Sequence, residues 1–108
     1  MKLTLSEETK YQNSVAGTYF LQEYMTNNKQ IWIHQSGAKA IWWNTNDFWS
    51  VGLEENLGKA KGNITGPARD DRAPTEISEG WEYAKDGVFI LADRNEVHAE
   101  DLTYKSGM

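Results

Sequence analysis

The sequence contains no cysteine, only two prolines, and fewer basic than acidic residues. Without cysteine the chain can form neither a disulfide nor a thiolate metal site, so its stability must come from the packing of apolar side chains. Eleven lysines and arginines stand against 16 aspartates and glutamates, which gives a formal net charge of −5. Because nucleic acids and anionic membrane surfaces are bound mainly through clustered basic side chains, we expect neither of them as a partner.

Long apolar runs are also missing. No stretch approaches the roughly 18 residues of a membrane-spanning helix, and the N-terminal stretch MKLTLSEETK lacks the apolar centre of a signal peptide. These absences fit a cytosolic protein, and they fit equally a domain that belongs to a larger secreted chain. The compartment therefore stays open, whereas a length of 108 residues is typical of a single domain.

Tryptophan is what the chain does have, and four of its five tryptophans lie within residues 30–52, QIWIHQSGAKAIWWNTNDFWSVG. Each large aromatic side chain buries about 150–250 Å² of surface. We therefore expect the tryptophans to be the main source of stability.

Short apolar runs alternate with polar turns between residues 17 and 52, and each run shows the period of two that is typical of a strand. Asparagine and glycine in the intervening segments favour tight turns. The pattern predicts four strands, over residues 17–25, 30–35, 38–43 and 48–51. Their spacing of about ten residues indicates an antiparallel meander.

Residues 53–80 have little periodicity and contain both prolines. We expect one long irregular connection with a short strand around residues 63–65. Loops longer than about 12–15 residues are uncommon in compact domains. This connection is either a functional loop or a well-packed cover over one edge of the sheet.

The remaining segments complete the predicted domain. The dipeptide Asp86-Gly87 predicts a hairpin over residues 81–92. We expect residues 1–16 to be a flexible lead-in and residues 93–108 a C-terminal tail that is frayed, helical or one more edge strand. The predicted fold is all-β: a single-domain antiparallel β-meander over residues 17–92, with about five to seven strands, strongly twisted or barrel-like.

The order of these residues resembles a small tryptophan-rich β module that recurs, often in several copies, in large multidomain proteins of protists and marine invertebrates. The resemblance covers residues 17–91 and rests on dispersed residues: Gly17-Thr18-Tyr19, Asn27-Asn28, Trp42-Trp43, Phe48 to Gly52, Leu57-Gly58, Pro74 and Trp81. Such modules have no settled activity. The resemblance implies the fold and a non-enzymatic role, and it identifies no functional residues.

Motifs of catalysis are absent from the sequence, so we expect no catalytic residue, no metal site and no cofactor. No serine lies in a Gly-x-Ser-x-Gly motif, and the acidic pair Asp70-Asp71 lacks the spacing of a calcium loop. Glycosidase chemistry needs two carboxylates about 5–10 Å apart. No spacing singles out a pair among the candidate carboxylates, which are Glu23, Asp47, Glu54 and Glu82.

The aromatic block is the remaining functional signal. Trp42 and Trp43 are adjacent in one predicted strand, so their side chains must point to opposite faces of the sheet. Two explanations compete: either the sheet is covered on both faces, or one aromatic face is open and binds something. His34, in the preceding strand, is predicted to be a cross-strand partner of an aromatic side chain rather than a base or a metal ligand.

An open aromatic face flanked by amides and carboxylates would suit sugar rings. The predicted ligand-binding residues are Trp32, His34, Trp42, Trp43, Asn44, Asn46, Asp47 and Trp49. The predicted function is a non-catalytic recognition module with a glycan as its first candidate ligand. The alternative is a structural or adhesive module that binds protein or forms a homo-oligomer, and a small β-scaffold enzyme is the third.

Overall fold

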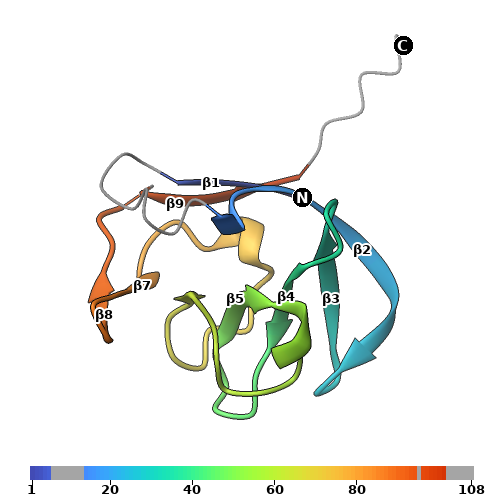
Figure 1. Cartoon of the computed structure of the whole chain (residues 1–108). Coiled ribbons are helices and arrows are strands. Elements are labelled where there is room, and N and C mark those ends of the chain that lie inside the picture. The colour runs from blue at the N-terminus through green and yellow to red at the C-terminus, as the bar shows by residue number, and fades with distance from the viewer. Residues whose placement is uncertain (6–13, 95, 102–108) are drawn as a thin grey trace, which may run out of the picture.

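The computed structural model describes residues 1–5, 14–94 and 96–101, and these residues form a curled antiparallel sheet (Figure 1). The elements that lie wholly within these residues are, in chain order, β1 (Lys2–Leu5), β2 (Gly17–Thr26), β3 (Lys29–His34), β4 (Lys39–Trp43), β5 (Trp49–Leu53), the 3₁₀ helix η2 (Glu54–Asn56), β6 (Ile64–Thr65), the 3₁₀ helix η3 (Pro74–Glu76), β7 (Glu82–Lys85), β8 (Val88–Leu91) and β9 (Val97–Glu100).

The strand order explains the curl. The sheet runs β8-β7-β6-β5-β4-β3-β2-β1-β9, so β8 and β9 form its two edges although they are consecutive in the chain. An extended chain spans at most about 20 Å over the six steps from Leu91 to Val97. The two edges must therefore approach each other at that end, and the sheet bends into a half-barrel (Figure 1).

The predicted meander is confirmed in its central part. The four strands expected between residues 17 and 51 correspond to β2–β5, and the expected hairpin corresponds to β7 and β8. The turns have the positive φ angles that such hairpins require: 52° at Asn27, 65° at Asn28 and 52° at Asp86. The all-β class and the antiparallel meander follow from local sequence patterns.

The prediction of about five to seven strands is wrong, because there are nine. Of the two additional strands, β1 lies in the expected lead-in, where no strand was predicted, and β9 lies in the expected tail, for which one more edge strand was one of the three alternatives. They pair with each other over four residues, and Leu3 lies opposite Ala99. Each is only four residues long, too short for a clear periodic signal, and each is stabilised by a partner from the other end of the chain. The rest of the predicted lead-in (6–13) and tail (102–108) lies outside the described residues.

The concave side of the sheet holds the main core. Trp49 lies at its centre and contacts two other indoles edge to face, with ring centroids 5.8 Å from Trp32 and 5.4 Å from Trp43. Such edge-to-face pairs contribute about 0.5–1.5 kcal/mol beyond the area that they bury. Trp81, Tyr19 and Tyr83 belong to the same buried cluster.

The convex side of the sheet carries a second, smaller core. Trp42 is completely buried there with Ile31 and Ala40, and Leu57 from the long connection packs against them. Trp43, on the concave side, is 8% exposed. The two adjacent tryptophans therefore point to opposite faces as predicted, and both faces are covered.

The long connection between β5 and β7 is held in place by buried indole groups. Trp42 Nε1 donates to the carbonyl of Lys59 (2.9 Å), and Trp49 Nε1 donates to that of Arg72 (2.7 Å). Trp81 Nε1 donates to the carbonyl of Ile77 (2.9 Å). These bonds satisfy both the buried indole donors and the loop carbonyls, so a segment without periodicity becomes an ordered cover.

We predict that Trp42→Ala and Trp43→Ala both destabilise the domain strongly. Each removes a buried indole, and such truncations typically cost about 3–5 kcal/mol of unfolding free energy. Urea unfolding followed by circular dichroism measures the change. Tyr24→Ala, at an exposed position of β2, is the control and should stay within about 0.5 kcal/mol of the parent chain. A near-neutral result for either tryptophan would contradict the two-sided covering.

We also predict that Gly17→Ala destabilises the domain more than Gly37→Ala. Both glycines have positive φ angles, 132° and 80°, so both substitutions strain the backbone. A Cβ at Gly17 would lie 2.5 Å from His34 Nε2, whereas a Cβ at Gly37 meets no atom within 4 Å.

The same urea titration compares the two glycine variants. Adding His34→Ala to Gly17→Ala should recover part of the loss, because it removes the clashing ring. Equal losses for the two glycine variants would show that steric contact with His34 has no role.

Candidate functional site

A pocket of about 510 Å³ opens on the convex side of the sheet, and we call it the outer pocket. Its volume is within the roughly 300–1,000 Å³ range of small-molecule sites. Three segments line it: the β4–β5 turn, the part of the long connection that contains residues 60–62 and β6, and the β7–β8 hairpin. The lining residues are Asn44, Asn46, Phe48, Ala60, Lys61, Gly62, Thr65, Glu82 and Phe89.

The strand register explains why these side chains share one face. Thr65 pairs with Glu82 across β6 and β7, and the neighbouring pair Ile64 and Tyr83 points into the concave core. Since side chains alternate along a strand, Thr65 and Glu82 must point to the convex side. Phe89 pairs with Ala84 on that same side.

The segment before β6 is held close to β5 and forms one wall of the outer pocket. Asn63 N donates to the carbonyl of Val51 (2.7 Å). A Cβ at Gly62 would lie 3.0 Å from that same carbonyl oxygen, so a residue without a side chain allows this approach. The two residues before Gly62, Ala60 and Lys61, then project along the rim.

Two aromatic rings and four polar side chains face the outer pocket. Phe89 is 47% exposed and Phe48 is half-buried, so their rings present apolar surface to a ligand. Asn46, Lys61, Thr65 and Glu82 supply an amide, an ammonium, a hydroxyl and a carboxylate. Within the described part of the chain, the polar groups of these four side chains make no hydrogen bonds to other residues.

The eight predicted ligand-binding residues do not form one site. Asn44 and Asn46 line the outer pocket. Trp43 and Asp47 line a shallower depression of about 330 Å³ beside Asn27 and Asn28. Trp32 and Trp49 reach a third hollow, which lies between the β2–β3 hairpin and Ala73. Trp42 is completely buried. The four tryptophans of the block are core residues, and they offer no open stacking surface.

Asn44 has a structural role in the β4–β5 turn. Its Nδ2 donates to Ser50 Oγ (2.7 Å), and its Oδ1 accepts from the backbone N–H groups of Asn46 (2.8 Å) and Phe48 (3.2 Å). The side chain is buried, and both its Oδ1 and its Nδ2 make hydrogen bonds within the turn and to β5. Asn44 therefore shapes the outer pocket by positioning Asn46 and Phe48 on its rim.

His34, which was also among the predicted ligand-binding residues, is the cross-strand partner of an aromatic side chain that the sequence predicted, and it lines none of these three hollows. It lies opposite Tyr19 across β2 and β3, with ring centroids 5.1 Å apart in an edge-to-face arrangement. Its Nδ1 accepts from the Ser36 N–H (3.0 Å), and its Nε2 donates to the Ala16 carbonyl (3.0 Å). Both ring nitrogens are occupied, so His34 has no free group for a ligand or a metal.

The acidic part of the long connection is neutralised by neighbouring basic groups. Arg72 donates to both carboxylate oxygens of Asp70, at 2.9 and 2.6 Å, and this hydrogen bonding lowers the pKa of Asp70 below its usual value. Asp71 pairs with Lys29 at 3.3 Å. Among the described residues, no group of three or more histidine, cysteine or acidic side chains could hold a metal ion.

Five of the aromatic and polar side chains that face the outer pocket were not among the predicted ligand-binding residues: Phe48, Lys61, Thr65, Glu82 and Phe89. Phe48 and Phe89 were visible as aromatics within predicted strands, but their exposure depends on segments distant in sequence. Lys61 lies in a stretch without periodicity. In a strand, the residue beside a buried aromatic points to the other face of the sheet, as Glu82 does beside Tyr83. A search for such positions would have found part of this face.

We predict that tryptophan fluorescence reports on the core and not on the outer pocket. All five indoles are buried, so acrylamide should quench the native chain several-fold less than the chain unfolded in guanidinium. No tryptophan lines the outer pocket, so a ligand bound there should leave the emission unchanged. A ligand-induced shift would instead place binding in the depression beside Trp43 or in the hollow that Trp32 and Trp49 reach.

Comparison with protein-family profiles, with curated proteins and with solved structures finds no match to this chain. No helix in the described part of the chain is long and apolar enough to cross a membrane.

Proposed function

We propose that this chain is a non-catalytic recognition module that binds a small ligand in the outer pocket, with a carbohydrate as the first candidate. The observation that carries the proposal is the combination of two accessible phenyl rings, Phe48 and Phe89, with uncommitted polar groups around them. Pockets of this kind use apolar surface for affinity and a few polar groups for orientation.

A sugar ring matches this combination. Its C–H face is apolar and packs on an aromatic ring, while its hydroxyl groups both donate and accept hydrogen bonds. Asn46 and Thr65 can do both, Lys61 donates and Glu82 accepts. With one positive and one negative side chain at the rim, the pocket favours a neutral polar ligand over a strongly charged one.

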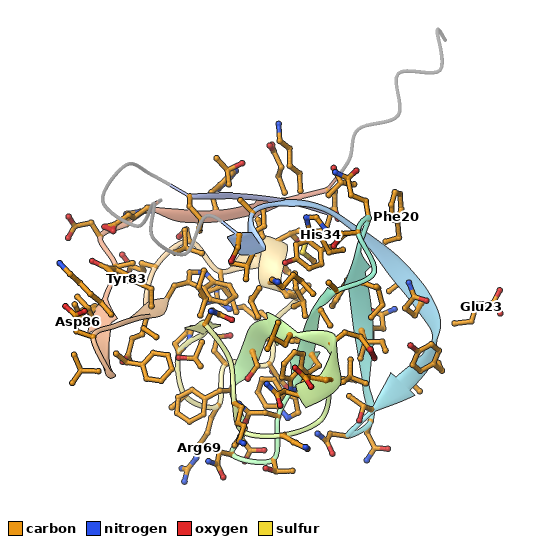
Figure 2. The ribbon with its side chains drawn as sticks, viewed as in Figure 1. Phe20, Glu23, His34, Arg69, Tyr83 and Asp86 are labelled. Atoms are coloured by element: carbon orange, nitrogen blue, oxygen red, sulfur yellow. The ribbon has the colours of Figure 1, made fainter. Side chains whose placement is uncertain are left out.

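The arrangement of carboxylates supports a binding role rather than glycoside hydrolysis. Of the four candidate carboxylates, Glu82 lines the outer pocket and Asp47 lines the depression beside Trp43. Glu23 projects from β2 away from the body of the molecule (Figure 2). Hydrolysis needs two carboxylates on either side of one bond, and among the described residues that line the outer pocket Glu82 is the single carboxylate. An enzyme remains the third hypothesis.

A protein-interaction module is the second candidate, and a specific surface favours it. Strand β2 exposes four large apolar side chains, Phe20, Leu21, Tyr24 and Met25. Aromatic residues and methionine are enriched at protein–protein interfaces, and because neighbours in a strand point to opposite faces, Phe20 and Leu21 expose apolar surface on both sides of β2. The resemblance to repeated tryptophan-rich modules is compatible with either candidate.

We predict that Phe89→Ala weakens binding of a glycan found on an array by about tenfold, which corresponds to about 1.4 kcal/mol. The physical reason is the loss of the ring that the sugar contacts. Isothermal titration calorimetry measures the affinity. Phe20→Ala is the matched control, because Phe20 is a phenylalanine of similar exposure on β2 and lies outside the outer pocket.

Asn46→Ala should also weaken the binding, through the loss of hydrogen bonds to hydroxyl groups. Equal affinities for Phe89→Ala and the parent chain would exclude the outer pocket as the glycan site. If the array gives no ligand and Phe20→Ala abolishes capture of a protein partner, the second candidate replaces the first.

A further inference from the structure

We propose that the open edge of β8 pairs with the same edge of a second copy, so that two chains form an antiparallel, two-fold dimer with one continuous sheet. This inference concerns the edge of the sheet beside the outer pocket, with which it shares Phe89, and it does not depend on the proposed ligand. It rests on the direction of the β8 backbone groups, on its exposed apolar side chains and on the charges at its two ends.

The backbone of β8 presents unpaired hydrogen-bonding groups to solvent. β8 is an edge of the sheet and pairs with β7 on one side, with Ile90 opposite Tyr83. Ala92 N donates to the Trp81 carbonyl (2.8 Å), so the backbone groups of even-numbered residues point toward β7. The N–H and C=O groups of Phe89 and Leu91 therefore point away from the sheet, and no strand of the described part pairs with them.

The side chains of β8 do not protect this edge. Natural edge strands usually avoid association through charged side chains, proline or bulges. The sequence of β8, VFIL, has none of these features, and Val88, Phe89 and Leu91 are 59%, 47% and 67% exposed. Strand β9, at the other edge, instead exposes His98 and Glu100, 3.9 Å apart. The two edges are thus different, and β8 is the one open to pairing.

One register satisfies the backbone, the apolar side chains and the charges together. If Ile90 of each copy lies opposite Ile90 of the other, Phe89 faces Leu91 twice, and the outward backbone groups of both residues pair across the interface. Phe89 and Leu91 share the convex side, where cross-strand apolar pairs stabilise a sheet.

Charged groups at the strand ends support the same register. It brings Asp86 of each copy opposite Arg94 of the other, and Asp93 opposite the uncharged Gly87. Asp86 and Arg94 are both exposed, and Asp86 lies at the left margin of the molecule, in the turn that precedes β8 (Figure 2). A register in which Asp86 met Asp93 would place like charges together and would be disfavoured.

The dimer should be weak, because a four-residue edge buries less than the roughly 1,200 Å² of typical stable complexes. Sedimentation equilibrium from about ten micromolar to one millimolar is therefore the test. We expect the mass to rise from that of the 12.3 kDa chain toward twice that value. Amide hydrogen exchange of Phe89 and Leu91 should slow as the concentration increases. A monomer over the whole range, or exchange independent of concentration, would overturn the proposal.

Substitutions locate the interface. Leu91→Lys should weaken the association at least tenfold. Met25→Lys introduces the same charge at a similarly exposed position on β2 (63%) and should leave the association unchanged. Leu91→Pro removes an outward N–H without breaking the β7–β8 ladder and should also prevent pairing. Arg94→Glu should weaken the dimer and Lys59→Glu should not. Loss of association in Met25→Lys alone would assign the interface to β2 and refute the β8 pairing.

Discussion

The buried indole N–H groups are the interaction on which the rest of the structure depends. Trp42, Trp49 and Trp81 each donate to a carbonyl of the connection between β5 and β7. A buried donor without a partner costs about 1–3 kcal/mol, so each bond both satisfies an indole and holds a loop carbonyl in place. Removing the connection would leave three buried donors unsatisfied and expose both faces of the sheet.

The connection therefore has the two roles that its sequence left open. Its first part covers the convex core through Leu57, and the segment just before β6 approaches β5 closely enough to form a wall of the outer pocket. The same segment that buries the tryptophans thus forms part of the outer pocket, in which Phe48 and Phe89 are accessible on the convex side of the sheet. The packing of this connection against the sheet therefore has two consequences: it buries the tryptophans, and it forms the candidate site.

Phe89 links the outer pocket to the edge of the sheet. Its side chain lines the pocket, while its backbone groups point to the open edge of β8. In the proposed dimer, Leu91 of the second copy would lie beside each Phe89 ring, so the two pockets would be neighbours on one convex surface. Such an arrangement would favour ligands with repeated units, because a second contact on the same surface adds avidity.

Local sequence patterns determined the strands and turns of residues 17–52 and 81–92. Period-two alternation and residues that accept positive φ, such as Asn27 and Asp86, act over a few neighbours and can be read from the chain directly. The opposite orientation of Trp42 and Trp43 follows from the same geometry. Tertiary structure alone decided which surfaces are open. The carbonyl that pairs with Trp42 belongs to Lys59, and the strand that pairs with β1 lies near the other end of the chain. The exposure of Phe89 depends on residues 46–65. Burial is a property of segments distant in sequence, and no local pattern specifies it.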